Sequence, residues 1–146
     1  MPTRVGDPGL VVREVEHTAD VGFEVEAPTI EALFERAGLA TLSVAIGLET
    51  VEARERVALE VRADDLTSLL HDWLQQLVIV LQARGIVLSE LGVDDVSEVA
   101  VRGWGAGERV DRGRHRIYTE VKGVSYHELA VRETATGWWA RVILDV

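Results

Sequence analysis

The side chains best suited to chemistry gather in residues 16–24, which read EHTADVGFE. This stretch carries an imidazole at His17, a hydroxyl at Thr18 and a carboxylate at Asp20. Groups of these types can hold a metal ion or a proton. Strand-like residues precede and follow them, so the stretch is predicted to connect two strands. Connections of this kind often carry function, because the rigid elements on either side position their side chains.

Two further carboxylates stand at the opposite end of the sequence. Asp145 contributes a side-chain carboxylate and Val146 a main-chain terminal carboxylate. If the last strand is anchored in a sheet, both groups are held in place. With a third carboxylate from a loop, they would provide hard oxygen ligands for Ca²⁺ or Mg²⁺. The alternative is that these terminal groups are simply solvated.

Two amphipathic helices are predicted to support these groups. The first begins at Thr29, a suitable N-cap, and its apolar spacing ends at Gly47. The second opens at Asp64 and Asp65 and closes at Gly85. Its apolar stripe predicts core packing and consists of Leu66, Leu69, Leu70, Trp73, Leu74, Leu77, Val78 and Leu81. The polar residues off this stripe are expected to be solvated: His71, Asp72, Gln75 and Gln76.

Strands are predicted over much of the remaining chain, at residues 11–16, 21–27, 51–62, 86–88, 96–101, 118–131 and 138–146. The last of these is apolar on both faces, which predicts a central position in the sheet. Within residues 118–131, strand alternation would place Ser125 and His127 on one face and Lys122 on the other. Turn chemistry is expected at residues 92–95, and a hairpin or bulge at the glycine-rich residues 103–108.

The order of these elements predicts an α+β fold. We expect a mixed, mainly antiparallel sheet with the two helices packed on one face. Residues 1–10 are predicted to be a loose N-terminal lead-in, and residues 11–146 a single domain, since no repeat or linker interrupts them.

Charge and composition restrict the function. The chain has 146 residues and a net charge of −10, so strong direct binding to nucleic acid is not expected, whereas cations and basic proteins are suitable partners. The basic residues 111–116 are either a solvated loop or a contact for a phosphate or an acidic surface. The lack of cysteine excludes disulfides, zinc–thiolate sites and thiol nucleophiles. Without a signal core or a membrane-length apolar run, the cytoplasm is the expected compartment.

Several motifs in this order resemble the archease family. They are residues 16–22 (EHTADVG), residues 121–127 (VKGVSYH), the closing residues 142–146 (VILDV) and a Leu-Leu-x-Asp-Trp-Leu pattern in the second helix. The similarity runs from about Val12 to the end of the chain. One departure is visible, because the family pattern after the lysine usually reads Ala-Val-Thr-Tyr-His. Here it is Gly123 to His127, and Ser125 retains the hydroxyl.

The resemblance implies a non-enzymatic accessory protein of the GTP-dependent RNA-splicing ligase. Such proteins promote guanylylation of the ligase and its multiple turnover in tRNA splicing. The family's metal site, carried over by motif position, implies Asp20, Asp145 and Val146 as ligands of a divalent cation, Ca²⁺ or Mg²⁺. Asp65 is a further acidic candidate near this surface.

His17 is expected either to orient Asp20, in the way that residues hydrogen-bonded to metal ligands often orient them, or merely to shape the loop. Lys122 and His127 are either part of the same partner-facing surface or ordinary strand residues. Two other functions stay open. One is a chaperone or modulator of a tRNA-modification enzyme such as a tRNA methyltransferase. The other is a metal-dependent hydrolase using Asp20, Asp145 and a histidine base, against which the lack of a dense ligand motif and of a nucleophile counts.

Overall fold

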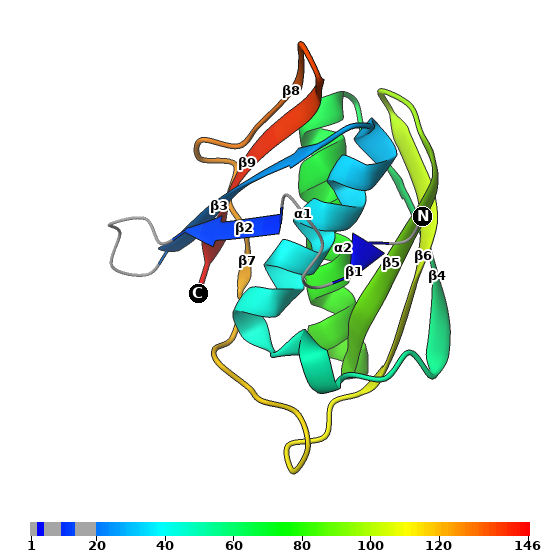
Figure 1. The fold of residues 1–146 in the computed structure, drawn as a ribbon, viewed down its shortest axis with the longest axis vertical. Helices are drawn as coiled ribbons and strands as arrows, with labels where there is room; N and C mark the ends of the chain where they lie inside the picture. The colour runs from blue at the N-terminus through cyan, green and yellow to red at the C-terminus, as the bar shows by residue number, and fades with distance from the viewer. Residues whose placement is uncertain (1–2, 5–9, 14–19) are drawn as a thin grey trace.

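Two helices lie between two antiparallel sheets (Figure 1). The computed structural model describes residues 3–4, 10–13 and 20–146. The helices are α1 (Ile30–Ala45) and α2 (Leu66–Arg84), and a short 3₁₀ helix, η1 (Leu48–Thr50), follows α1. The predicted α+β class is confirmed, although the strands divide into two sheets and every described strand pair is antiparallel.

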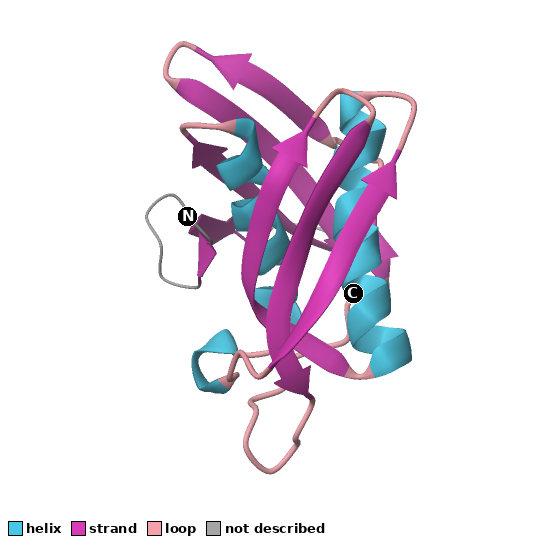
Figure 2. Ribbon diagram, turned by 90° about the vertical axis from the view of Figure 1, so that its right-hand side faces the viewer, coloured by secondary structure: helices cyan, strands magenta, loops and turns pink. Residues whose placement is uncertain are grey.

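The first sheet has the order β1-β5-β6-β4. Its strands are β1 (Thr3–Arg4), β4 (Glu55–Arg62), β5 (Ile86–Val96) and β6 (Ala100–Arg109). Figure 2 shows the long strands of this sheet in front of the helices. Within the predicted lead-in, Thr3–Arg4 pairs with β5.

The second sheet has the order β2-β3-β9-β7, with β8 also paired to β9. Its strands are β2 (Leu10–Arg13), β3 (Asp20–Ala27), β7 (Gly123–Val124), β8 (Ala130–Thr134) and β9 (Gly137–Asp145). The closing strand β9 is central, as its apolar residues on both faces predict.

The helix ends follow the predicted caps. Thr29 accepts a hydrogen bond from the Ala32 N–H (3.1 Å), and Asp65 accepts one from the Ser68 N–H (2.7 Å). Gly85 ends α2 in the left-handed conformation (φ 64°), which glycine adopts without steric cost. Trp73 and most of the leucine stripe of α2 are buried, and the Trp73 indole donates to the Phe34 carbonyl (3.0 Å).

Two predictions about the second half of the chain are wrong, for residues 92–95 and 118–131, and the hairpin or bulge at residues 103–108 is right only in that the β5–β6 pairing is irregular there. Residues 92–95 continue β5 instead of turning, and residues 103–108 continue β6. The register irregularities lie on the opposing strand β5, between Leu88 and Glu90 and between Val93 and Asp95. Residues 118–131 do not form one strand, since only β7 and the beginning of β8 are extended there.

Candidate metal site

Asp20 and Asp145 are brought together by the pairing of β3 with β9. The two residues lie directly opposite each other in the antiparallel register. Directly opposed residues share a face of the sheet, with Cβ atoms roughly 4.5–5.5 Å apart. Successive side chains of a strand point to opposite faces of the sheet. Phe23 and Val25 of β3 are buried in the core between the sheets, so the even-numbered Asp20 lies on the outer face. Asp20 is half-buried and Asp145 is exposed.

On its other side, the end of β9 pairs with the short strand β7. Gly123 is the register partner of Asp145 on this side, and the Lys122 N–H donates to the Asp145 carbonyl (2.8 Å). Val146 follows directly, half-buried and packed against the hydrophobic core. The end of β9 is therefore anchored on both sides, which is the condition that a site at the C-terminus requires.

The two carboxylates form no ion pair with any residue that the structure describes. Neither Asp20 nor Asp145 makes a side-chain ion pair or hydrogen bond there. Like charges directly opposite each other on two strands are destabilising. A divalent cation with oxygen ligands would remove this repulsion, so the donor set fits Ca²⁺ or Mg²⁺.

The other predicted site residues do not complete a side-chain ligand cluster. Among the described residues, no three His, Asp or Glu side chains are grouped closely enough to hold a metal ion, so neither Asp65 nor His127 joins the pair. The third ligand that the sequence predicts, the terminal carboxylate of Val146, is a main-chain group. His17 lies outside the described residues.

Asp65 has a clear local role. It is the N-cap of α2, and the hydrogen bond from Ser68 lowers the pKa of its carboxyl group below the ordinary value. An ionised carboxylate also suits the positive end of the helix dipole. The Asp65 carboxylate thus stabilises the start of α2.

Lys122 and His127 lie on either side of β7, in loops. Both side chains are exposed. The Ser125 hydroxyl accepts a hydrogen bond from the His127 N–H (2.9 Å), which folds the chain into a turn after β7. The predicted strand alternation of Lys122, Ser125 and His127 is wrong, because β7 has only two residues.

His71 and Gln75 were expected to be solvated, and the structure contradicts this. His71 Nε2 lies 2.7 Å from the Val124 carbonyl oxygen, and Gln75 Oε1 accepts a hydrogen bond from the Val124 N–H (3.0 Å). Both side chains are half-buried. The only signal in the sequence is that they share one side of α2, away from the leucine stripe.

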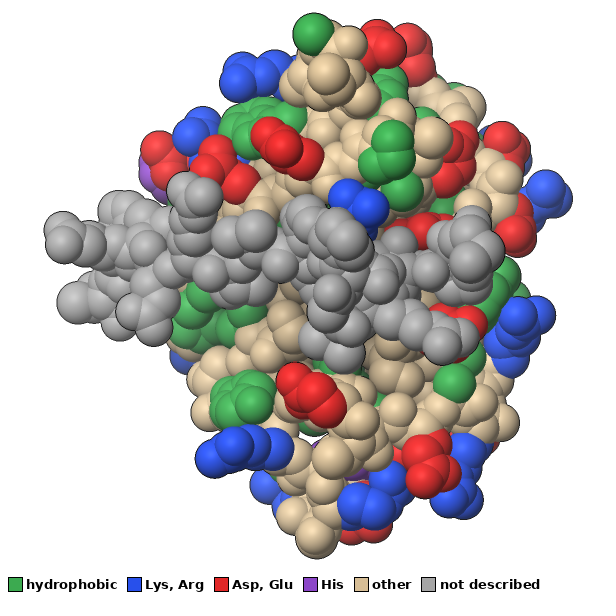
Figure 3. Space-filling model, viewed as in Figure 1, with side chains coloured by type: hydrophobic (Ala, Val, Ile, Leu, Met, Phe, Trp, Pro, Cys, Tyr) green, Lys and Arg blue, Asp and Glu red, His purple; other side chains and the backbone are tan. Residues whose placement is uncertain are grey.

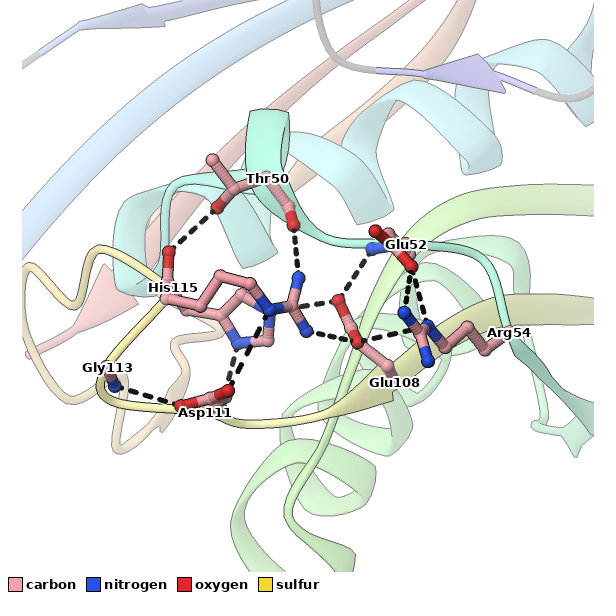
Figure 4. A network of polar contacts seen from close by, with 8 residues as sticks. Thr50, Glu52, Arg54, Glu108, Asp111, Gly113 and His115 are labelled. Atoms are coloured by element: carbon pink, nitrogen blue, oxygen red, sulfur yellow. Dashed lines mark hydrogen bonds and ion pairs between the residues drawn. The ribbon is translucent and has the colours of Figure 1, made fainter.

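A second polar cluster, far along the chain from the carboxylate pair, surrounds Glu108 (Figure 4). The Glu108 carboxylate receives hydrogen bonds from the Arg114 guanidinium (2.5 Å) and the Glu52 N–H (2.7 Å), and it lies 3.0 Å from His115 Nε2. Arg114 and the Glu52 N–H hold the pKa of Glu108 down at about 2. Residues 111–116 are therefore not simply a solvated loop, because Arg114 forms an ion pair with Glu108 and His115 is buried.

The acidic charge of the protein is not gathered in one patch on the face shown in Figure 3, where acidic and basic side chains are interspersed. Within the described residues, no helix is long and apolar enough to cross a membrane. The fold and the carboxylate pair together define an α+β protein whose oxygen-rich sheet end suits a divalent cation.

Comparison with known proteins identifies the family. Residues 13–146 match the model of the archease protein family (MTH1598/TM1083). Protein archease of Methanopyrus kandleri is 37% identical over 136 residues, covering 91% of this chain and 97% of that protein. Protein archease of Methanosarcina mazei is 33% identical, covering 90% and 93%. The chain belongs to the archease family.

Two solved structures have the same fold. The solution structure of Methanobacterium thermoautotrophicum protein 1598 has a TM-score of 0.72 at 31% identity, covering 90% of this chain and 96% of that one. The crystal structure of a Thermotoga maritima archease, described as a possible chaperone, has a TM-score of 0.65 at 19% identity, covering 92% and 96%. The latter shows likeness of fold alone.

Proposed function

We propose that this protein is an accessory factor of the GTP-dependent RNA-splicing ligase. It promotes guanylylation of the ligase, and thereby multiple turnover, during tRNA splicing in the cytoplasm. Membership of the archease family supports this proposal, since the family resemblance implies a ligase of this class as the partner. The observation that carries the proposal is the uncompensated pairing of Asp20 with Asp145 at the anchored end of β9.

In this proposal Asp20, Asp145 and the terminal carboxylate of Val146 hold one divalent cation, Ca²⁺ or Mg²⁺. When bound, such a cation neutralises the carboxylates and offers coordination positions to phosphate oxygens. Asp20 and Asp145 fix its place on rigid strands, while β7 and the core contacts of Val146 hold the strand end. The exposed Lys122 lies next to Gly123, the register partner of Asp145, and adds a positive charge to the partner-facing surface.

An accessory role fits this geometry better than hydrolysis. The carboxylate pair stands at an exposed sheet end, and no third His, Asp or Glu side chain joins it within residues 20–146. Guanylylation requires positioned phosphates and metals, and an added protein can supply positioning without supplying a nucleophile. The net charge of −10 favours docking on the basic RNA-binding face of a ligase over binding RNA itself.

The test of the partner is a turnover assay with the GTP-dependent ligase of the same organism. Substoichiometric addition of this protein is expected to convert the ligase from single to multiple turnover, with GTP and an RNA bearing a 2′,3′-cyclic phosphate. The same number of ligations per ligase with and without the protein would contradict the assignment.

A second candidate is a chaperone or modulator of a tRNA-modification enzyme, such as a tRNA methyltransferase. It is favoured by the description of the Thermotoga maritima protein as a possible chaperone. This role predicts less light scattering when the modification enzyme is heated with the protein. It also predicts that the Asp20→Asn variant still prevents aggregation of the enzyme, because a solubilising surface does not require the metal ligands.

A further inference from the structure

The short strand β7 has one edge on β9 and the other on helix α2. On the β9 side, the Lys122 N–H donates to the Asp145 carbonyl (2.8 Å) and the Ser125 N–H donates to the Ile143 carbonyl (2.9 Å). An edge strand of two residues has little pairing of its own. The contacts on the outer edge of β7 therefore determine how firmly β7 stays paired with β9.

The outer edge of β7 is bound by two side chains of α2. Both backbone polar groups of Val124 have a partner on α2. The Val124 carbonyl oxygen lies 2.7 Å from His71 Nε2, and the Val124 N–H donates to Gln75 Oε1 (3.0 Å). The two residues are four apart, so they lie one above the other on one side of the helix. Unpaired backbone groups of the buried Val124 would cost free energy, and His71 and Gln75 satisfy them.

His71 is itself held in a fixed orientation. Its Nδ1 lies 2.9 Å from the Asp72 carboxylate. The two ring nitrogens therefore face one hydrogen-bond acceptor each, the Asp72 carboxylate and the Val124 carbonyl. The Tyr126 ring stacks on the imidazole, with 3.8 Å between centroids and 11° between planes. The imidazole is thus fixed by contacts on its edge and on one face.

We propose that His71 and Gln75 are positioning residues for the metal site. By binding both backbone groups of Val124, they hold β7 against the end of β9 and so fix the backbone of Asp145, whose carboxylate then stays opposite Asp20. This inference rests on the proposed function, because it concerns the same carboxylate pair. Neither residue touches the metal ion.

The test uses the full chain and Ca²⁺ as the probe, with affinity measured by isothermal titration calorimetry. His71→Phe keeps a ring for Tyr126 to stack on but removes the hydrogen bond to Val124. Loss of groups that support metal ligands typically weakens affinity about 10–100-fold, and we expect at least about tenfold weaker Ca²⁺ binding. His71→Gln, which can restore a donor to the Val124 carbonyl, is expected to recover most of the affinity.

Gln75→Leu removes the hydrogen bond from the Val124 N–H and leaves the stacking of His71 on Tyr126 in place. It tests the same inference if His71→Phe fails to fold. The matched control is Gln76→Leu, since Gln76 is the adjacent half-buried glutamine and makes no side-chain hydrogen bond within residues 20–146. The control is expected to bind Ca²⁺ within twofold of the wild type. Folded His71→Phe and Gln75→Leu variants that also bind within twofold would overturn the inference.

Amide hydrogen exchange separates this inference from the proposed function. The Lys122 N–H, which donates to Asp145, is expected to exchange faster in Gln75→Leu than in Gln76→Leu. A wild-type protein that binds no Ca²⁺ contradicts the metal site, while faster exchange at Lys122 still supports the positioning of β7. Unchanged exchange at Lys122 overturns the positioning role, whatever the Ca²⁺ affinity.

Discussion

Asp20 at the start of β3 lies directly opposite Asp145 at the end of β9. The two carboxylates come from opposite ends of the sequence and meet on one face of a sheet, and neither forms an ion pair with a residue that the structure describes. Sheets rarely place two like charges in this relationship without a reason, because the pair repels. A divalent cation bound by both carboxylates would remove this repulsion.

The first prediction concerns Asp20→Asn. Without metal, the variant is expected to be more stable than the wild type by roughly 0.2–1 kcal/mol, because the cross-strand repulsion is removed. Ca²⁺ at 100 times its dissociation constant stabilises the wild type by about 2.7 kcal/mol and is expected to leave the variant nearly unchanged. Chemical unfolding with Ca²⁺ or with a chelator measures both effects.

Glu24→Gln is the matched control for this experiment. Glu24 lies on the same face of β3 but opposite Arg141, so its charge is not part of the like-charged pair. The control is expected to keep the full Ca²⁺ response. A Glu24→Gln variant that loses the response as Asp20→Asn does would point to general surface charge instead of a site.

The second prediction concerns the terminal carboxylate of Val146. A semisynthetic protein with a C-terminal amide keeps the valine side chain, which packs against the core, and removes only the charge. We expect at least about tenfold weaker Ca²⁺ binding, with the free energy of unfolding of the metal-free protein unchanged within about 0.5 kcal/mol. Equal Ca²⁺ affinity of the acid and the amide would exclude this group as a ligand.

The third prediction concerns acid stability. Arg114 and the Glu52 N–H lower the pKa of Glu108 from its ordinary value of 4.5 to about 2. The ionised carboxylate therefore stabilises the fold above pH 4.5, and this contribution is lost as the pH falls from 4.5 to about 2. Urea unfolding should show Glu108→Gln well below the wild type at pH 6, with the difference shrinking towards pH 2. The exposed Glu60→Gln serves as the control, and parallel curves for wild type and Glu108→Gln would contradict the prediction.

The fourth prediction concerns the glycine-rich strand β6. A Cβ atom at Gly107 would collide with the Val87 carbonyl oxygen and lie 2.8 Å from the Leu88 Cα, both backbone atoms of β5. Gly107→Ala is expected to destabilise the protein by at least about 1–3 kcal/mol, because overpacking here must displace a paired strand. At Gly113 the nearest atom is the Asp111 carboxylate oxygen at 3.3 Å, which can move. Gly113→Ala should therefore shift the thermal midpoint little, and equal shifts for the two variants would refute the reasoning.

Local signals in the sequence predicted the elements that position the site. Thr29 and Asp65 cap the two helices, and Gly85 ends α2, because these are short-range hydrogen-bond and backbone preferences. The central position of β9 also follows from its continuous apolar residues. The meeting of Asp20 with Asp145 was expected from the family resemblance, and the register of β3 with β9 confirms that these two residues meet. Metal binding by them stays a prediction.

What the sequence did not reveal depends on contacts between distant segments. His71 and Val124 are 53 residues apart, so nothing near His71 indicates that a loop folds back onto it. The glycines of residues 103–107 suggested a hairpin or a bulge, whereas they allow the backbone of β5 to approach β6 closely. The division of the strands into two sheets is likewise a matter of tertiary packing, because each helix buries apolar residues against strands of both sheets.

Activation of the ligase through the carboxylate pair can be measured as the number of ligations per molecule of the GTP-dependent RNA ligase, with this protein added at one-tenth of the ligase concentration. We expect many turnovers with the wild type and with Glu24→Gln. We expect single turnover with Asp20→Asn or Asp145→Asn, both folded by circular dichroism. Full stimulation by the two aspartate variants would contradict the metal site as the source of activation, and no stimulation by the wild type would contradict the function itself.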